Sequence, residues 1–158
     1  IRAAHDALAA RIPEGAVGIV HGDFRPGNIA YSPDGQAVAV FDWELATIGD
    51  PLCDLGHLLV SWSEPDDAVP AALPSPTAAG GYPRRQELIA RYTEATGTGD
   101  VDVSYYLAFA RWRAACIHAG VWTRYRAGDM GADADPDEVT GPEAIIEQAE
   151  TALAELDG

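Results

Sequence analysis

The sequence predicts one α+β domain that is mostly α-helical and spans residues 1–158. The chain has 158 residues, 47% of them hydrophobic, which is enough to bury a core. Alanine is abundant, and several long segments repeat apolar residues at helical spacing. Only one short stretch near the N-terminus combines strand-like runs with a strong turn signal. We therefore expect a helical body that carries one small β-hairpin.

The first third of the chain contains the predicted hairpin. Residues 1–12 read as a helix, because apolar positions recur near every 3.6 residues and Pro13 follows. A short apolar run at 16–20 predicts a strand that leads into a loop. Two further strands, at 29–31 and 37–41, flank the turn sequence Ser-Pro-Asp-Gly.

The remainder of the chain is predicted to be helical with two long loops. A helix begins at Gly49-Asp50-Pro51, with Asp50 as N-cap and Pro51 in the first turn, and runs to about Trp62. Five prolines and a Gly-Gly pair make 63–83 a long loop, and the acidic stretch 128–141 is predicted to be a second one. The later helices are expected at 84–96, 103–127 and 142–156.

Three polar residues accompany the hairpin. Asp23 and Asn28 lie on the loop that enters it, and Asp42 follows its second strand. Five residues of loop can turn the first two side chains toward one cleft, and the hairpin returns Asp42 beside Asn28. Carboxylate and amide oxygens are ligands that Mg²⁺ prefers, and a neighbouring carboxylate can orient an attacking hydroxyl. Each residue alone is typical of a turn or a cap, but together they indicate Mg²⁺-dependent phosphoryl transfer.

Three motifs follow one another in this region: His-Gly-Asp-x-x-x-x-Asn, Asp-Trp-Glu and Gly-Asp-Pro-x-x-Asp-Leu. In this order they resemble the aminoglycoside phosphotransferase and choline kinase group of small-molecule kinases, including the related domain found with some acyl-CoA dehydrogenases. The Asp-x-x-x-x-Asn spacing also occurs in the catalytic loop of protein kinases. The resemblance covers about residues 17–59 and implies the C-terminal lobe of a protein-kinase-like fold.

The resemblance implies the reacting part of the site. Asp23 would be the catalytic residue that orients the hydroxyl of a small-molecule acceptor. Asn28 and Asp42 would hold Mg²⁺ against the phosphates of ATP or GTP, and Glu44 would assist the metal through water.

The resemblance also implies supporting residues. Asp54, on the following helix, would hold the backbone of the catalytic loop, and His21 would brace the same loop. For Arg25 two interpretations stay open: contact with the transferred phosphate, or a salt bridge with Asp42 or Glu44.

A kinase also needs a nucleotide-binding lobe with a glycine-rich loop and a lysine. The chain contains no lysine, and the 20 residues before His21 are too few for a five-stranded lobe. We therefore expect the N-terminal lobe of the same protein to be a missing partner. The chain begins with Ile1, and we expect a fragment or processed product that is inactive alone, because the phosphate clamp supplies positioning and charge stabilisation.

The net charge is −15, and all ten cationic side chains are arginines. Such acidity disfavours nucleic acid and anionic membranes as partners, and no apolar run reaches the length of a membrane span. The net negative charge fits a cationic acceptor, although a need for solubility explains this charge at least as simply. Cys53 and Cys116 lie far apart in apolar helical segments, which predicts buried free thiols and a cytoplasmic protein.

An alternative is a non-catalytic, pseudokinase-like module that uses the same cleft for a ligand or partner. The retained Asp23, Asn28 and Asp42 favour an enzyme. A protein kinase is disfavoured, because Asp-Trp-Glu replaces Asp-Phe-Gly and no Ala-Pro-Glu follows. Three helical histidines are expected to be packing or surface residues: His5, His57 and His118. The arginines of the 103–127 helix could pair with acidic groups or contact an anionic substrate.

Overall fold

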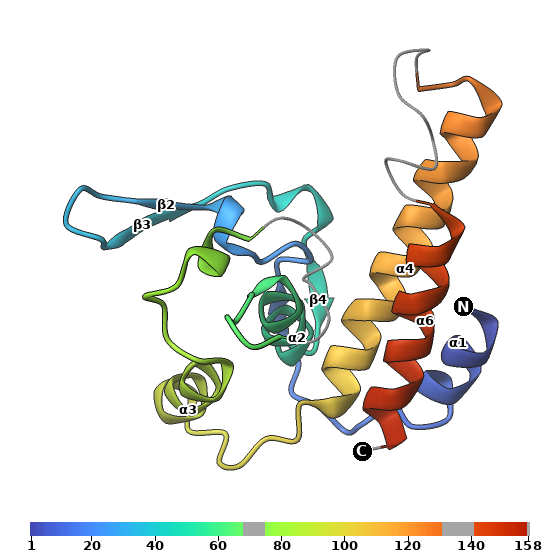
Figure 1. Ribbon diagram of the computed structural model, residues 1–158. Helices are drawn as coiled ribbons and strands as arrows, with labels where there is room; N and C mark the ends of the chain where they lie inside the picture. The colour runs from blue at the N-terminus through green and yellow to red at the C-terminus, as the bar shows by residue number, and fades with distance from the viewer. Residues whose placement is uncertain (68–74, 131–140, 158) are drawn as a thin grey trace.

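Three helices form the body of the protein. The computed structural model describes residues 1–67, 75–130 and 141–157. Within them, α1 (Arg2–Ala9), α4 (Ser104–Ala127) and α6 (Pro142–Asp157) lie side by side (Figure 1). Helix α6 follows α4 along much of its length, and α1 packs against both helices. This body stands beside the strands that carry the predicted site.

Small side chains allow α4 and α6 to approach each other closely. The shared core consists of the buried residues Ala115, Ile145 and Ala149. Ala119 and Trp122 pack against this core. On the same pair of helices, Arg111 Nε donates to Glu155 Oε1 at 2.8 Å. Close packing of this kind leaves little room for larger side chains.

Helix α2 (Leu52–Ser61) packs against α4. A Cβ at Gly56 would lie 2.4 Å from the carbonyl oxygen of Tyr106, so only glycine permits this approach of α2 to α4. The Tyr106 hydroxyl donates to Asp50 Oδ2 at 2.7 Å. Asp50 Oδ1 in turn accepts from the Leu52 N–H at 3.0 Å. The turn that starts α2 is therefore fastened to α4.

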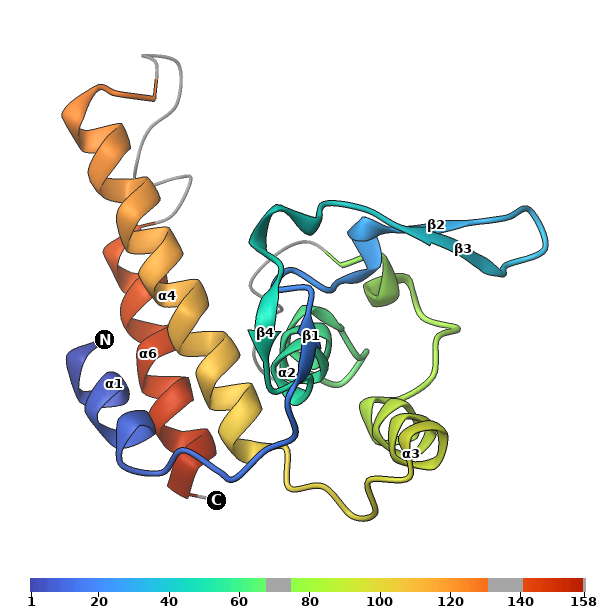
Figure 2. The ribbon, with the colours of Figure 1, turned by 180° about the vertical axis from the view of Figure 1, so that it is seen from behind.

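The strands form two antiparallel pairs. Strand β1 (Gly18–Val20) pairs with β4 (Thr47–Gly49), and β2 (Ile29–Tyr31) pairs with β3 (Ala37–Val40). Figure 2 shows β1 and β4 beside α2, with the β2–β3 hairpin projecting away from the helices. The short 3₁₀ helices η1 (Pro26–Asn28) and η2 (Trp43–Leu45) connect the hairpin to the first pair.

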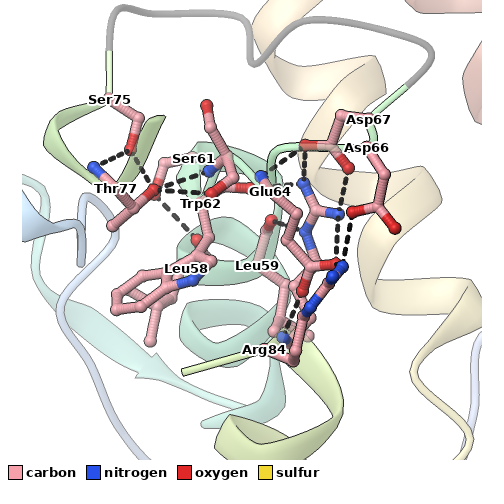
Figure 3. Close-up of polar contacts among 12 residues, drawn as sticks. Leu58, Leu59, Ser61, Trp62, Glu64, Asp66, Asp67, Ser75, Thr77 and Arg84 are labelled. Carbon is pink, nitrogen blue, oxygen red and sulfur yellow. Dashed lines mark hydrogen bonds and ion pairs between the residues drawn. The ribbon is translucent and has the colours of Figure 1, made fainter. Parts of the chain in front are cut away.

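A polar network joins the end of α2 to the start of α3 (Arg85–Thr96) (Figure 3). Arg85 donates to the carbonyl oxygens of Leu59, at 2.9 Å, and Trp62, and it reaches both carboxylate oxygens of Asp67 at 2.6 Å. The guanidinium thus donates to backbone oxygens at the end of α2, where Leu59 O also accepts the Trp62 N–H at 3.3 Å. Nearby, the Thr77 hydroxyl of η3 (Pro76–Ala79) bonds both backbone groups of Ser63.

The predicted fold class, α+β and mostly helical with one small hairpin, is confirmed. The helices and the hairpin occur within a few residues of the predicted bounds, and α1 already ends at Ala9. Strand β4 was not predicted, because its partner β1 lies almost 30 residues away in the sequence. The predicted loops 63–83 and 128–141 include segments, 68–74 and 131–140, that lie outside the described residues.

Both cysteines are free thiols, but they are half-buried rather than fully buried. Burial, together with the nearby Asp50 and Asp54 carboxylates, raises the pKa of Cys53 to about 11. Among the described residues, no helix is both long enough and apolar enough to cross a membrane.

Candidate active site

The loop between β1 and β2 requires glycine at its second residue. Gly22 has a φ of +85°, a conformation that side chains with a Cβ rarely adopt. A Cβ there would also lie 2.6 Å from the carbonyl oxygen of Leu45 in η2. The close passage of η2 over the loop therefore explains the glycine of the His-Gly-Asp motif.

Asp54 holds the same loop from α2. Its Oδ2 accepts the backbone N–H of His21 at 2.6 Å, and its Oδ1 accepts that of Gly22 at 2.9 Å. One carboxylate thus binds two successive N–H groups that no strand partner satisfies, and hydrogen bonds to a charged acceptor are among the stronger ones in proteins. The carboxylate of Asp54 therefore connects α2 to the backbone of the loop.

His21 links the loop to the end of the hairpin. Its side chain is buried, with 2% exposure. The Asp23 N–H lies 3.1 Å from Nδ1, and Nε2 lies 2.7 Å from the carbonyl oxygen of Phe41. Since Nδ1 accepts, Nε2 must carry the proton and donate, which corresponds to the neutral ring. The imidazole therefore acts as a brace between the two ends of the site.

Asp23 receives hydrogen bonds on both carboxylate oxygens. Asn28 Nδ2 donates to Oδ2 at 2.8 Å, Arg25 Nε lies 3.4 Å from Oδ2, and His57 Nε2 lies 3.0 Å from Oδ1. Burial raises the pKa of Asp23, but Asn28, His57 and Arg25 together outweigh burial and lower it. The carboxyl group is consequently ionised at neutral pH and can accept a hydrogen bond from a hydroxyl.

Two of these partners differ from the sequence predictions. Arg25 pairs with Asp23 itself, and not with Asp42 or Glu44, because the guanidinium turns back along its own loop. His57, expected to be a packing or surface residue, contacts the central carboxylate. The sequence held a usable signal, since Asp54 and His57 are three residues apart and therefore share one face of α2.

Asn28 and Asp42 lie at the same end of the hairpin. The Phe41 N–H donates to the Asn28 carbonyl oxygen at 2.8 Å, which sets Asp42 next to this position. The Asn28 amide group donates to both the backbone oxygen and the carboxylate of Asp23. Its Oδ1 therefore remains as a ligand atom without a hydrogen bond from any described residue.

Asp42 is the one non-glycine residue in the described part of the chain with a positive φ, at +67°. Such backbone conformations cost free energy and concentrate at functional sites. The Asp42 side chain is exposed and makes no hydrogen bond with the described residues. A carboxylate and an amide oxygen that both lack a hydrogen bond and belong to the same end of the hairpin suit Mg²⁺, which commonly takes one or two protein ligands and leaves the rest to phosphates and water.

Glu44 lies in η2, two residues beyond Asp42, with an exposed side chain. Over residues 1–67, 75–130 and 141–157, no group of three or more His, Cys, Asp or Glu side chains could hold a metal ion. The chain's own ligand set is thus small, and it fits a metal bound mainly through phosphates.

A pocket of about 230 Å³ opens beside Asp23, between α2 and α4. His57 and Arg113 lie in its wall with His118, and its apolar lining includes Leu45 and Ile117. Burial is the largest cause that lowers the pKa of His57, and Arg113 lowers it further against the opposite effect of Asp23. Burial likewise lowers the pKa of His118.

Comparisons with known proteins identify the family and the fold. The model of the phosphotransferase enzyme family matches residues 1–88, more than half of the chain. A crystal structure from Ralstonia eutropha, provisionally described as an aminoglycoside phosphotransferase, superposes with a TM-score of 0.78 at 30% identity. The match covers 99% of this chain and 48% of that one. The chain therefore belongs to the phosphotransferase enzyme family and has a kinase-like fold, as the motifs indicated.

Curated relatives are much longer proteins. Acyl-CoA dehydrogenase family member 11 of Homo sapiens is 34% identical over 118 residues, and the probable acyl-CoA dehydrogenase IBR3 of Arabidopsis thaliana is 30% identical over 122 residues. Each match covers 73% of this chain and 15% of the relative. The chain thus corresponds to a small part of these proteins.

Proposed function

We propose that the chain is the acceptor- and metal-binding lobe of an ATP- or GTP-dependent phosphotransferase that modifies a hydroxyl group of a small molecule. The observation that carries this proposal is the arrangement of Asp23, Asn28 and Asp42. The ionised carboxylate of Asp23 accepts a hydrogen bond from the Asn28 amide group. Asn28 Oδ1 and the carboxylate of Asp42, whose φ is positive, remain without a hydrogen bond from any described residue at the same end of the hairpin.

In this proposal Asp23 accepts the hydrogen bond of the acceptor hydroxyl and directs its oxygen toward the phosphate. Arg25 and Asn28 fix the orientation of the carboxylate through Oδ2, so that Oδ1 faces His57 and the pocket. Asn28 Oδ1 and the Asp42 carboxylate would hold Mg²⁺. When bound, the ion would neutralise charge on the nucleotide phosphates.

The rest of the nucleotide site is proposed to come from another part of the same polypeptide. The chain has no lysine for the phosphate clamp. An apolar surface beside the loop supports a further lobe there: Ile19 and Ile48 face each other across β1 and β4 with 68% exposure each, and Phe41, Trp43 and Leu45 are also exposed. Exposed apolar patches of this kind typically mark interfaces.

A nucleotide titration tests whether the nucleotide site is shared between this chain and a further lobe. The 158-residue chain alone is expected to bind Mg²⁺–ATP weakly and to show no turnover, whereas the full-length protein binds it in the ordinary range for kinases. Tight Mg²⁺–ATP binding by the chain alone would contradict the proposed second lobe.

Replacing Asp23 tests the catalytic role. In the full-length protein, Asp23→Asn is expected to lower kcat by about 100- to 10,000-fold, the range typical of a lost proton-accepting group. Asp34→Asn, on the exposed turn of the hairpin, is the matched control and should leave kcat unchanged. Unchanged turnover in Asp23→Asn would instead favour a binding module without phosphoryl transfer.

A further inference from the structure

Four arginines of the described chain are only partly exposed, and one of them lacks a counter-ion. Arg25 pairs with Asp23, Arg85 with Asp67 and Arg111 with Glu155. The Arg113 side chain makes no hydrogen bond or ion pair with any residue the structure describes, although the chain has 25 acidic residues and only ten cations. A half-buried guanidinium is costly to leave unpaired, because it has given up part of its hydration.

Carboxylates lie near Arg113 but are engaged elsewhere. Arg113 lines the pocket that holds Asp23 and an adjoining hollow of about 330 Å³ that holds Asp50 and Asp54. Asp23 accepts from Asn28 and His57. Asp54 accepts two backbone N–H groups of the catalytic loop, and Asp50 binds Tyr106 and starts α2. None of them can turn toward Arg113 without giving up hydrogen bonds that shape the site.

Among the described residues that line the pocket, Arg113 carries the only positive charge. Burial and Arg113 lower the pKa of His57, and burial lowers that of His118, so both rings are neutral near pH 7. The rest of the lining is mainly aliphatic, from Leu45, Val60 and Ile117. The pocket thus offers a carboxylate for a hydroxyl, an apolar wall and one guanidinium.

We propose that the acceptor is a small aliphatic hydroxy acid, and that Arg113 binds its anionic group while Asp23 receives its hydroxyl. This inference rests on the proposed phosphotransferase function and names the substrate class of the same pocket. Arginine is well suited to this role, because its planar donors bind a carboxylate through two parallel hydrogen bonds. A cationic acceptor would meet the unpaired guanidinium, so the acidity of the whole chain does not determine the charge preference of the pocket.

A series of acceptors that differ only in terminal charge tests the proposal on the full-length protein. The probes are 6-hydroxyhexanoate, 1,6-hexanediol and 6-amino-1-hexanol, with the four-carbon analogues as a second length. With saturating Mg²⁺–ATP, kcat/KM is expected to be at least about tenfold higher for the hydroxy acid than for the diol, and lowest for the amino alcohol. Equal values, or a preference for the amino alcohol, would overturn the proposal.

Variants of Arg113 test whether this residue causes the preference for the hydroxy acid. Arg113→Gln should raise KM for the hydroxy acid by about 10- to 100-fold and leave the diol unaffected. Arg113→Lys should keep the preference for the anion but bind it more weakly, which also covers the case that Arg113→Gln fails to fold. Arg124→Gln, exposed near the end of the same helix, removes the same charge and should change nothing. An increase in KM for ATP without a change in acceptor preference would assign Arg113 to the nucleotide and refute the proposal.

Binding measurements separate this proposal from the phosphotransferase function. Isothermal titration of the same probes into full-length protein without nucleotide reads recognition directly. Binding of the hydroxy acid that is lost in Arg113→Gln supports the pocket assignment even if Asp23→Asn leaves turnover unchanged. If the hydroxy acid binds no better than the amino alcohol, the substrate class is wrong, whatever the fate of the phosphotransferase function.

Discussion

The catalytic loop and the α4–α6 pair hold their shapes by different interactions. The loop between β1 and β2 is tied by side chains that bond backbone groups, chiefly from Asp54 and His21, while apolar side chains around it stay exposed. The two helices are held by close packing of alanines. Polar ties fix the orientation of a few groups, and apolar packing supplies most of the stability. We therefore expect changes in the loop to alter the site, and changes between the helices to alter stability.

The contact between α2 and α4 connects the two regions, and the stability of the protein should be most sensitive to added volume at this contact. A Cβ at Gly56 would overlap the backbone of Tyr106, and backbone cannot move aside as a side chain can. Gly56→Ala is expected to lower the free energy of unfolding by about 3 kcal/mol, measured by urea denaturation of the 158-residue chain.

Gly120→Ala is the matched control for that variant. It lies on α4 with no atom within 4 Å of an added Cβ. It should raise stability by about 0.5–1 kcal/mol, the normal gain from replacing a helical glycine. Equal effects of the two changes would show that α2 and α4 do not pack closely at Gly56.

Removing the carboxylate of Asp54 should loosen the loop. Asp54→Ala leaves two backbone N–H groups without an acceptor and is expected to cost about 2 kcal/mol. Hydrogen exchange at the amides of His21 and Gly22 should accelerate, while exchange in α4 and α6 changes only with global stability. Unchanged protection of the two amides would mean that Asp54 does not hold the loop.

Adding volume between α4 and α6 should lower stability without altering the site. Ala149 has 5% exposure in their shared core, and Ala149→Leu is expected to cost about 1–3 kcal/mol by overpacking. Ala154→Leu, on the exposed side of α6, adds the same volume in open space and should cost little. In full-length protein both variants should retain kcat at temperatures where they are folded.

The smallest effect should be a pH dependence that comes from the pocket. The pKa values of His57 and His118 are lowered below the 6.5 of the unfolded chain. Below pH 6.5 the unfolded state therefore binds more protons, and the free energy of unfolding falls as the pH drops through 6.5 toward the lowered values.

Substitution by glutamine separates the contributions of His57 and His118 to the slope of the free energy of unfolding against pH. His57→Gln and His118→Gln should each flatten it, and replacement of the exposed His5 controls for loss of an imidazole. A stability that rises on acidification from pH 7 to 6 would contradict the buried, neutral state of these rings.

The elements could be predicted because their signals are local. Helical spacing, the Ser-Pro-Asp-Gly turn and the Asp50-Pro51 start depend on residues within a few positions of one another. Strand β4 was not predicted, because its pairing with β1 depends on a partner distant in the chain and its three residues carry too little pattern by themselves.

The sequence by itself determined the helices, the β2–β3 hairpin, the family and the set of polar residues at the hairpin, because motif spacing and local patterns are properties of neighbouring residues. Only the tertiary structure decided that Arg25 pairs with Asp23, that His57 contacts the same carboxylate, that Asp42 takes a positive φ and that Arg113 has no described counter-ion. These outcomes depend on which of many charged groups the fold brings together and which it leaves apart. Local spacing can bring such groups to one loop or one helix face, as it does for Asp54 and His57, but the contacts themselves depend on how the segments pack.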